Sequence, residues 1–336
     1  MLRLKFEEVQ RTLEQVLYTR NCPPEHARKV SYEMARNSLE GTYTHGINRF
    51  PRLIRNIDEG IVNVEAKPVL INRFGAIANY DGQLGLGITN AWFCMEQAMA
   101  LAKEYGIGLV ALRNTNHWQR AATYGYQACA QGMAAICFTN TIPNMPTWGA
   151  VDARIGNNPV MIAFPREKGD VVVDLAMSQF SYGALELARL EGRAMPFVAG
   201  YDEKGELTRD PAAVLKSRRL LPAGYWKGAA LSIVLDLLAA GLALGNTTAA
   251  IGRLAGDEHG VSQVFFVIDL YKIAPREEVE RIADDAVRDL LASQPIDQKG
   301  RIVYPGQRSK EIREQNLKLG IPVDERIWAQ ITAYLK

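Results

Sequence analysis

A histidine and an arginine lie four residues apart in the stretch Thr44-His45-Gly46-Ile47-Asn48-Arg49. A guanidinium holds a carboxylate with two parallel hydrogen bonds, and a nearby imidazole exchanges a proton at neutral pH. The stretch follows a predicted helix, where a loop presents side chains to a ligand. The spacing therefore favours an enzyme that grips an acid and moves a proton, although a loop histidine without chemistry gives the same pattern.

The other histidines offer one alternative donor. His117 lies in the polar loop 114–118 after a predicted strand, where α/β proteins often bind ligands. His26 is most simply a surface residue of a helix, and His259 a loop residue with substrate contact as its alternative. The histidines are too widely spread for the paired ligands of a zinc-protease helix, so no metal site is predicted.

Two glycine-containing stretches have more than one interpretation. Residues 81–87, Asp-Gly-Gln-Leu-Gly-Leu-Gly, stand between a predicted strand and a helix, but Asn90 occupies the place of the last glycine in a GxGxxG motif. This loop makes a tight turn or contacts a phosphate. Residues 224–228, Gly-Tyr-Trp-Lys-Gly, cap the following apolar helix or face a planar ring and a phosphate. The residues alone do not decide either case.

Hydrophobic periodicity predicts the elements that position these residues. The opening segment is helix and loop, with helices over 4–18, 24–39 and 52–58. Strands are predicted over 68–72, 76–80, 107–112, 133–138, 159–164, 171–175 and 262–269. Further helices are predicted over 88–105, 121–131, 181–192, 228–245, 277–292 and 323–335, with a loop over 199–211. This irregular alternation predicts an α/β domain with a mixed sheet.

Composition narrows the class of protein. The 336 residues carry 39 basic and 37 acidic side chains, a net charge of +2, which gives no electrostatic case for nucleic acid. The four cysteines form no CxxC pair, which favours a reducing compartment, and the charged N-terminus does not resemble a signal peptide. The apolar segment 228–245 has Asp236 in its middle and is predicted to be a core helix. We expect a cytoplasmic protein that spans no membrane.

Several stretches together resemble the type 2 malate/L-lactate dehydrogenase family, nicotinamide-dependent enzymes unrelated to Rossmann dehydrogenases. The resemblance covers nearly the whole chain and rests on residues 44–50, 106–114, 116–118, 154–159, 174–178 and 305–306. It implies a helical N-terminal region packed on a non-Rossmann α/β domain with a largely antiparallel mixed sheet, assembled as a homodimer. This fold would explain the missing GxGxxG motif. Residues 116–120 and 221–228 most resemble members that reduce a diketo sugar acid.

The resemblance also implies roles for particular residues. His45 would be the proton donor, with Arg49 and His117 nearby in the substrate site. Contacts to NADH or NADPH would come from Asp170, Val171, Val172, Val173, Asp174, Leu175, Ala176, Trp226, Lys227, Gly306, Gln307 and Arg308. Relatives usually carry a carboxylate after the Pro-Gly turn, which suits ribose hydroxyls, whereas the arginine here can suit a 2′-phosphate. We therefore expect better use of NADPH than in a typical relative.

The resulting expectation is a two-part enzyme for a small keto acid. Residues 1–66, joined by C-terminal helices in 308–336, would form the helical region, and residues 67–307 the cofactor-binding domain, with a helical insertion near 181–245. The reaction expected is hydride transfer to a 2-keto acid. Malate, lactate or ureidoglycolate oxidation, or reduction of a cyclic imine acid, are alternatives on the same scaffold. A metabolite-binding protein without catalysis is the alternative from another class.

Overall fold

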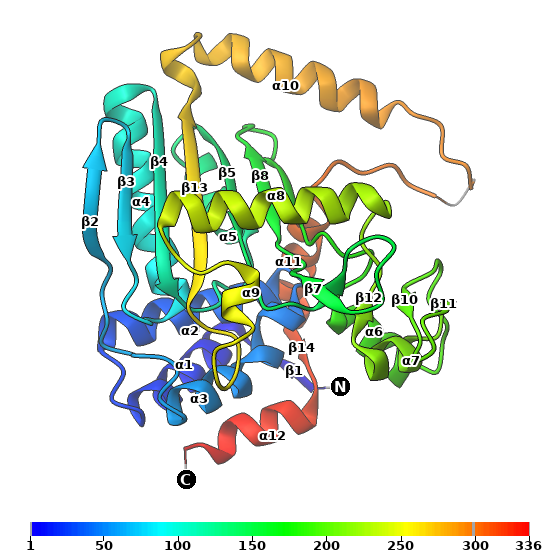
Figure 1. Ribbon diagram of the computed structural model, residues 1–336. Coiled ribbons are helices and arrows are strands. Elements are labelled where there is room, and N and C mark those ends of the chain that lie inside the picture. Colours follow the sequence, from blue (N-terminus) through cyan, green and yellow to red (C-terminus); the bar gives the residue numbers. More distant parts are fainter. Residues whose placement is uncertain (1, 298–299, 336) are drawn as a thin grey trace.

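A layer of helices opens the chain. The structure is a computed structural model that describes residues 2–297 and 300–335. Helices α1 (Phe6–Tyr18), α2 (Pro24–Leu39) and α3 (Phe50–Asp58) lie together below the sheet in Figure 1. Two short 3₁₀ turns, η1 (Tyr43–His45) and η2 (Ile47–Arg49), join α2 to α3. His45 and Arg49 therefore each end one of these turns.

Helix α2 is buried over most of its surface because α1 packs on it, and because η1, α4 and the C-terminal segment contact it as well. The prediction that His26 is a surface residue is consequently wrong. Its side chain is only 7% exposed, and its Nδ1 lies 2.8 Å from the carbonyl oxygen of Val64. Burial of this imidazole is made tolerable by that hydrogen bond.

The C-terminal segment returns to the helical layer. Strand β1 (Leu2–Leu4) pairs antiparallel with β14 (Ile321–Val323), which follows helix α11 (Gln307–Leu319). Helix α12 (Glu325–Ala333) then packs against α1 and α3. The predicted helix over 323–335 therefore begins too early. Asp324 ends the strand and caps α12, because its carboxylate accepts a hydrogen bond from the Arg326 amide.

The described chain forms a seven-stranded sheet in the order β2-β3-β4-β13-β5-β8-β9. In chain order its strands are β2 (Val69–Phe74), β3 (Ile77–Asp81), β4 (Ile107–Thr115), β5 (Met133–Thr139), β8 (Val160–Phe164), β9 (Val171–Leu175) and β13 (Val261–Asp269). Helix α4 (Gly87–Tyr105) crosses from the end of β3 to the start of β4, so this pair is parallel. The other described neighbours pair antiparallel, which confirms the expected mixed, largely antiparallel sheet.

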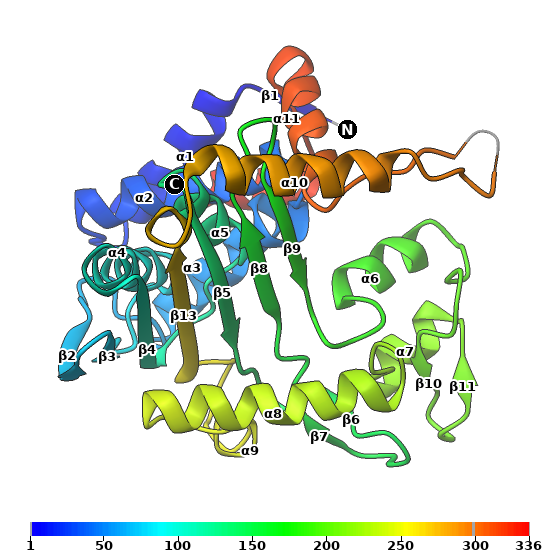
Figure 2. The ribbon, with the colours of Figure 1, turned by 90° about the horizontal axis from the view of Figure 1, so that it is seen from above.

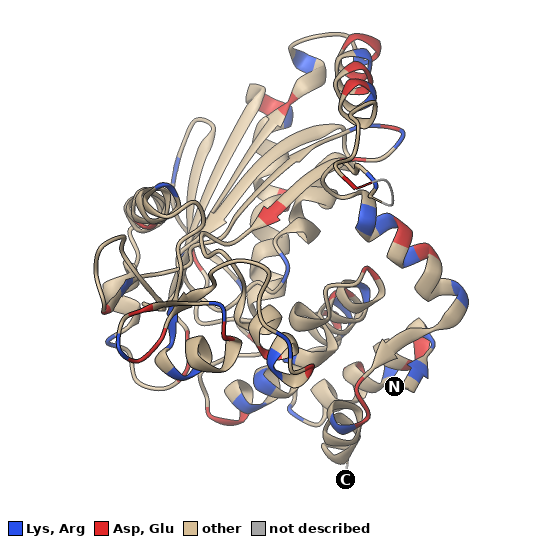
Figure 3. Ribbon diagram, turned by 90° about the vertical axis from the view of Figure 1, so that its right-hand side faces the viewer, with Lys and Arg blue, Asp and Glu red and all other residues tan. Residues whose placement is uncertain are grey.

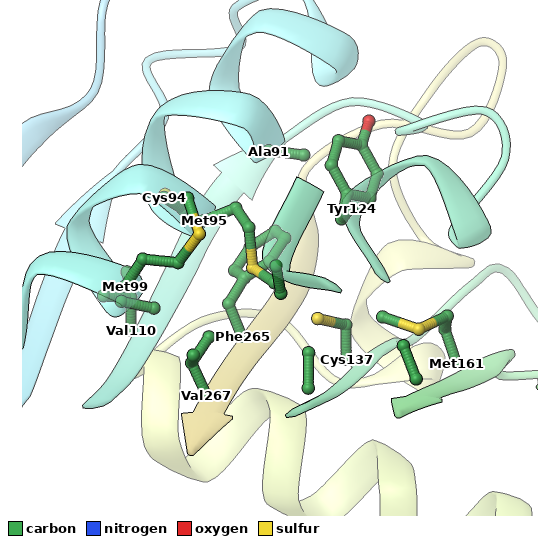
Figure 4. Packing of buried hydrophobic residues seen from close by; sticks show 14 of the residues in the cluster. Ala91, Cys94, Met95, Met99, Val110, Tyr124, Cys137, Met161, Phe265 and Val267 are labelled. Carbon is green, nitrogen blue, oxygen red and sulfur yellow. The ribbon is translucent and has the colours of Figure 1, made fainter. Parts of the chain in front are cut away.

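The larger hydrophobic core lies between the sheet and helices α4 and α5 (Ala122–Cys129), as Figure 4 shows. Phe265 on β13 is fully buried there and packs edge-on against the rings of Trp118 and Tyr124, at centroid distances of 5.8 and 6.0 Å. The Tyr124 hydroxyl donates to the Trp118 carbonyl oxygen at 2.6 Å. This core therefore fixes the residue directly after His117.

Helix α8 (Trp226–Ala243) crosses the opposite face of the sheet (Figures 1 and 2). Its Leu235 and Ala239 pack with Phe138 and Val264 of the sheet. The prediction of a core helix is correct only for this face, because 39% of the helix is buried. The outward face is apolar and exposed at Leu231, Ile233, Val234, Leu237 and Leu238. By length and composition alone α8 is the one helix in the described ranges that could cross a membrane.

Asp236, in the middle of α8, has a structural partner on each side. Its Oδ1 accepts hydrogen bonds from Asn140 Nδ2 and from the Thr248 amide, both at 2.8 Å. Asn140 follows β5, and Thr248 begins the short helix α9 (Thr248–Ile251). The carboxylate therefore ties α8 to two loops at one end of the sheet.

The remaining elements lie at the periphery. A small lobe beside β9 holds α6 (Tyr182–Leu190), α7 (Pro211–Ser217), β10 (Gly200–Tyr201), β11 (Leu207–Thr208) and β12 (Arg219–Leu220), so the predicted loop over 199–211 contains two short strands. The short strands β6 (Met145–Pro146) and β7 (Ala153–Ile155) pair below α8, and helix α10 (Arg276–Leu291) crosses the far end of the sheet after turn η3 (Leu270–Lys272). Basic and acidic residues alternate on the outer helices, while the strands are nearly free of charge (Figure 3).

Candidate active site

The end of helix α2 fixes the loop that carries His45. Asn37 Nδ2 donates to the His45 carbonyl oxygen at 2.9 Å, and Ser38 Oγ accepts from the Ile47 amide at 2.9 Å. Gly46 lies directly against α2, where a Cβ would collide with Ser38 Oγ and reach 2.8 Å from the Met34 carbonyl oxygen. Glycine is therefore required at this position for close packing rather than for flexibility.

The structure brings the two candidate histidines together. The rings of His45 and His117 are stacked with a centroid distance of 5.7 Å and an interplanar angle of 26°. The Gln119 amide donates to His117 Nδ1 at 2.9 Å, so the proton of a neutral His117 ring is on Nε2. Thr44 Oγ1 lies 3.1 Å from His45 Nδ1, a contact that suits either tautomer. The tautomer of neutral His117 is therefore fixed, whereas that of His45 is not.

The glycine loop over 81–87 supports the loop that carries His117. Asn116 Nδ2 donates to the carbonyl oxygens of Leu84 and Gly85, at 2.7 and 3.0 Å. The amides of Gly82, Gln83, Leu84 and Gly85 all donate within the protein. A Cβ on Gly87 would collide with the carbonyl oxygens of residues 116 and 117. Because these four amides are already engaged, residues 82–85 form a structural turn and offer no backbone donor to a phosphate.

Arg49 and Arg52 differ in their counter-charges. Arg52 forms a two-pronged ion pair with Asp257, which also lies 3.7 Å from Arg55. Within the described ranges Arg49 has no carboxylate at ion-pair distance. Burial, with Arg52 adding its positive charge, lowers the pKa of Arg49 to about 10. Arg49 therefore lacks a direct ion pair, and the nearby carboxylates of Glu258 and Asp257 offset only part of the lowering of its pKa.

A small, partly open cavity of about 20 Å³ is lined by Arg49, Arg52 and His117 together with Gln119 and Glu258. Its walls come from the helical layer, from the loop after β4 and from the loop before β13. A cavity of this size holds about one water molecule, so a larger ligand requires the walls to separate.

Both histidines are neutral at pH 7 in this arrangement. Burial, followed by the positive charges of Arg49 and Arg120, lowers the pKa of His45 to about 4. Burial and Arg49 also lower the pKa of His117 well below its ordinary value. The hypothesis of a His45 imidazolium therefore needs a bound anion, because a carboxylate on Arg49 offsets the repulsion and raises the pKa of His45.

The pH dependence of the reaction is expected to reveal this coupling. If reduction requires protonated His45, kcat/KM should fall as pH rises above about 4, because kcat/KM reports the protein before substrate binds. The kcat limb should lie at higher pH, because kcat reports the complex that already contains the substrate carboxylate. Steady-state rates from below pH 4 up to pH 9, with saturating coenzyme, measure both limbs. Two limbs at the same pH would contradict the coupling.

The first two predicted cofactor stretches meet at the edge strand β9. The Val172 amide donates to the Pro305 carbonyl oxygen at 3.0 Å, which places Gly306 and the start of α11 beside the strand. Gly306 has φ +96°, and a Cβ there would reach 3.1 Å from the Asp170 carbonyl oxygen. The Asp174 carboxylate accepts the Ala122 amide at 2.8 Å. Residues 170–176 and 306–308 therefore form one surface.

The third stretch adjoins the same strand. The Ala223 amide donates to the Met177 carbonyl oxygen at 2.8 Å, and a Cβ on Gly228 would lie 3.0 Å from that oxygen. This contact brings Trp226 and Lys227, both exposed at the start of α8, next to the end of β9. The three stretches thus flank β9, as they would around one cofactor. Ser178 Oγ, buried among them, lacks a hydrogen-bond partner in the described chain, so these residues fit a polar group of a nicotinamide coenzyme.

Several residues of this region were missed by the reasoning from sequence. Arg120 is 5% exposed, forms an ion pair with Glu40 of the helical layer and donates to Ser309 Oγ of α11 at 3.2 Å. Although burial alone would raise it, Arg120 and Arg36 hold the pKa of Glu40 below its usual range. Gly183 of α6 lies against Thr44, so that α6 covers the His45 loop. These contacts join segments that are distant in the chain. In the sequence only Arg120, a charged residue two positions after the apolar Trp118, indicated one of them.

The chemistry of the site is set by these charges. Among residues 2–297 and 300–335 no group of three or more His, Cys, Asp and Glu side chains is placed to hold a metal ion. An unpaired arginine beside two stacked imidazoles, next to a surface suited to a dinucleotide, can bind an acid and exchange a proton with it. The fold and the site together define an oxidoreductase without a Rossmann domain.

The chain belongs to the malate/L-lactate dehydrogenase family, whose model matches residues 4–332. It is 41% identical over 341 residues to 2,3-diketo-L-gulonate reductase of Klebsiella pneumoniae, covering 99% of this chain and 100% of that protein. The reductase of the same name from Salmonella typhimurium is 40% identical with the same coverage. The family resemblance deduced from the motifs is thereby confirmed.

Solved structures agree with this assignment. Sulfolactate dehydrogenase from Methanocaldococcus jannaschii superposes with a TM-score of 0.92 at 28% identity, covering 99% of this chain and 96% of that one. Delta1-piperideine-2-carboxylate reductase from Pseudomonas syringae superposes with a TM-score of 0.88 at 26% identity, covering 99% and 100%. The same fold therefore serves several acids, so the fold alone does not name the substrate.

Proposed function

We propose that the protein reduces a 2-keto acid of the diketo sugar acid class, such as 2,3-diketo-L-gulonate, with NADH or NADPH. The observation that carries this proposal is the unpaired Arg49 beside the stacked rings of His45 and His117. The curated relatives that carry the diketogulonate name support the substrate class. The alternatives keep the fold but change the acid, as the cyclic imine reductase does.

In the proposed mechanism Arg49 binds the substrate carboxylate with two hydrogen bonds and so fixes the keto group between the imidazoles. The Nε2–H of neutral His117 donates to the keto oxygen. As the carbonyl carbon gains a C–H bond, the electron pair of the C=O bond moves onto the oxygen, and His45 gives that oxygen its proton. The products are the hydroxy acid and neutral His45.

The coenzyme supplies the hydride when it is bound. The residues proposed to hold it are Asp170 to Ala176 on β9, Trp226 and Lys227 at the start of α8, and Gly306 to Arg308 at the start of α11. Gly306 allows the approach to β9, and Lys227 offers a positive charge for a phosphate. Asp174 also links this surface to the His117 loop through the Ala122 amide.

A substrate panel tests the proposed function. The purified protein is mixed with each coenzyme and with diketo sugar acids, simple 2-keto acids and cyclic imine acids, and the loss of reduced coenzyme is followed by its absorbance. Malate, lactate and ureidoglycolate are tested with oxidised coenzyme. The highest kcat/KM is expected for a diketo sugar acid. NADH binding without turnover of any of these compounds would favour the metabolite-binding alternative.

Coenzyme choice is expected to depend on Arg308. This side chain is exposed at the start of α11, whereas Gln307 is tied locally, with Oε1 3.3 Å from the Tyr304 amide and Nε2 3.1 Å from Glu311 Oε1. We expect wild type to use NADPH better than a typical relative does, because the guanidinium suits a 2′-phosphate. Arg308→Glu should shift the NADPH-to-NADH ratio of kcat/KM at least about tenfold toward NADH. A strong NADH preference in wild type would end this proposal.

We also propose that the protein is a cytoplasmic homodimer without membrane attachment. The exposed face of α8, at Leu231, Val234 and Leu237, is apolar enough for a contact with a second copy, which sedimentation velocity would detect as twice the mass of the chain.

For the division of the chain into domains, we propose residues 1–66 with 308–336 as one unit and 67–307 as the other. This division is supported by one hydrophobic cluster, which consists of buried residues from the range 4–62 together with Ile321, Val323 and Ile331. Leu86 and Ile88 of the second unit also belong to that cluster.

A further inference from the structure

Gln119 is a polar residue of the small cavity beside Arg49 and His117 that the proposed mechanism leaves unused. Its side chain is 6% exposed and lines the cavity together with Arg49 and His117. Within the described ranges no donor reaches its Oε1, although that atom is shielded from solvent. Buried polar atoms are almost always hydrogen-bonded in native proteins. An acceptor left open at this cavity is therefore available to a donor group of a bound ligand.

The backbone of Gln119 holds its side chain in place beside His117. Gln119 has φ +66°, in the left-handed region that residues other than glycine rarely adopt. This conformation directs the backbone N–H of Gln119 to His117 Nδ1, at 2.9 Å. Both neighbours are also fixed, because Trp118 is packed in the core and Arg120 is paired with Glu40. The side chain thus starts from a rigid turn adjacent to the proposed site of reduction.

The chemistry of keto acids limits what can donate to Oε1. The carboxylate and the keto oxygen are acceptors only, and the proposed mechanism already assigns them to Arg49 and to the two imidazoles. The carboxylate of Glu258, which also lines the cavity, already accepts the Ile142 amide at 3.1 Å. A substrate with hydrogen alone on its remaining carbons would leave the amide oxygen unpaired. A hydroxyl group on one of those carbons provides the missing donor.

We propose that Gln119 binds a hydroxyl group of the substrate and thereby selects hydroxylated 2-keto acids over their deoxy counterparts. This inference rests on the proposed function and assigns its specificity to a residue. A site built to hydrogen-bond a substrate hydroxyl can reject the analogue that lacks it by up to about 10⁴-fold. Hydrophobic contacts could not supply such discrimination, because they barely distinguish a hydroxyl from a hydrogen.

Matched pairs of substrates test this directly. 3-Hydroxypyruvate is compared with pyruvate, and 4-hydroxy-2-oxobutyrate with 2-oxobutyrate, under saturating coenzyme. Wild type should prefer the hydroxylated member of at least one pair. In Gln119→Leu the ratio of kcat/KM within that pair should fall about 10- to 100-fold, whatever the change common to both acids. Gln119→Gly removes the side chain while tolerating the left-handed backbone, so it keeps the test valid if the leucine variant folds poorly.

Gln127→Leu is the matched control. Gln127 is 9% exposed, and its Oε1 likewise has no partner in the described chain, but it lies in α5 and does not line the cavity. Its substitution should leave the ratio at the wild-type value. An unchanged ratio in both Gln119 variants, or the same fall in Gln127→Leu, would overturn the role of Gln119 while the proposed function stands. A wild type inactive on every 2-keto acid would overturn both.

Discussion

Replacement of His45 by alanine is expected to lower kcat for keto acid reduction by about 10²–10⁴-fold, the usual contribution of a positioned general acid. KM should change much less, because Arg49 still holds the carboxylate. The loop should keep its shape, since Asn37 bonds the backbone oxygen of residue 45 and Ser38 the amide of Ile47. Steady-state kinetics with saturating coenzyme, together with a thermal melt of the variant, measure the effect.

Two further histidine variants make the assignment decisive. His117→Ala removes a neutral donor to the keto oxygen and should lower kcat by about 10²-fold. His26→Ala, in α2 and bonded to the Val64 carbonyl oxygen, should keep the wild-type kcat and lower only the melting temperature. An active His45→Ala beside an inactive His117→Ala would assign the proton donor to His117.

Local features of the site follow from sequence more readily than distant ones. His45 and Arg49 are carried by consecutive short turns, so their spacing in the chain already indicates a shared loop. The stacking of His45 on His117 joins the helical layer to the end of β4, and spacing has no information on such a contact. Family resemblance supplied that pairing in advance. The ion pairs of Arg52 with Asp257 and of Arg120 with Glu40 escaped both approaches.

Helix α8 illustrates what composition cannot decide. Its sequence is apolar on every side, so periodicity gives no direction for the buried face. The structure buries Leu235 and Ala239 and leaves Leu231 and Leu237 exposed, so only one face of the predicted core helix lies in the core. The prediction of a surface position for His26 was wrong for the converse reason, because a polar helix is buried when neighbours cover it on several sides.

Arg49→Ala is expected to lower kcat/KM about 10²–10³-fold, mainly through KM, because the substrate carboxylate loses its two-pronged partner. Arg49→Lys should recover only part of this loss, since an ammonium keeps the charge without the fork. Arg55→Ala is the matched control. Arg55 approaches the same Asp257 at 3.7 Å, but its side chain is 57% exposed and does not line the cavity that Arg49 and His117 share.

The same variant tests the electrostatics of the site. Arg49 is one of the two cations that lower the pKa of His45. Its removal should raise that pKa toward the ordinary value, and the limb of the kcat/KM profile that falls with rising pH should move to higher pH. Arg55→Ala should leave the limb in place. A limb that stays put in Arg49→Ala would mean that Arg49 does not set the protonation of His45, and a loss confined to kcat would mean that it does not clamp the carboxylate.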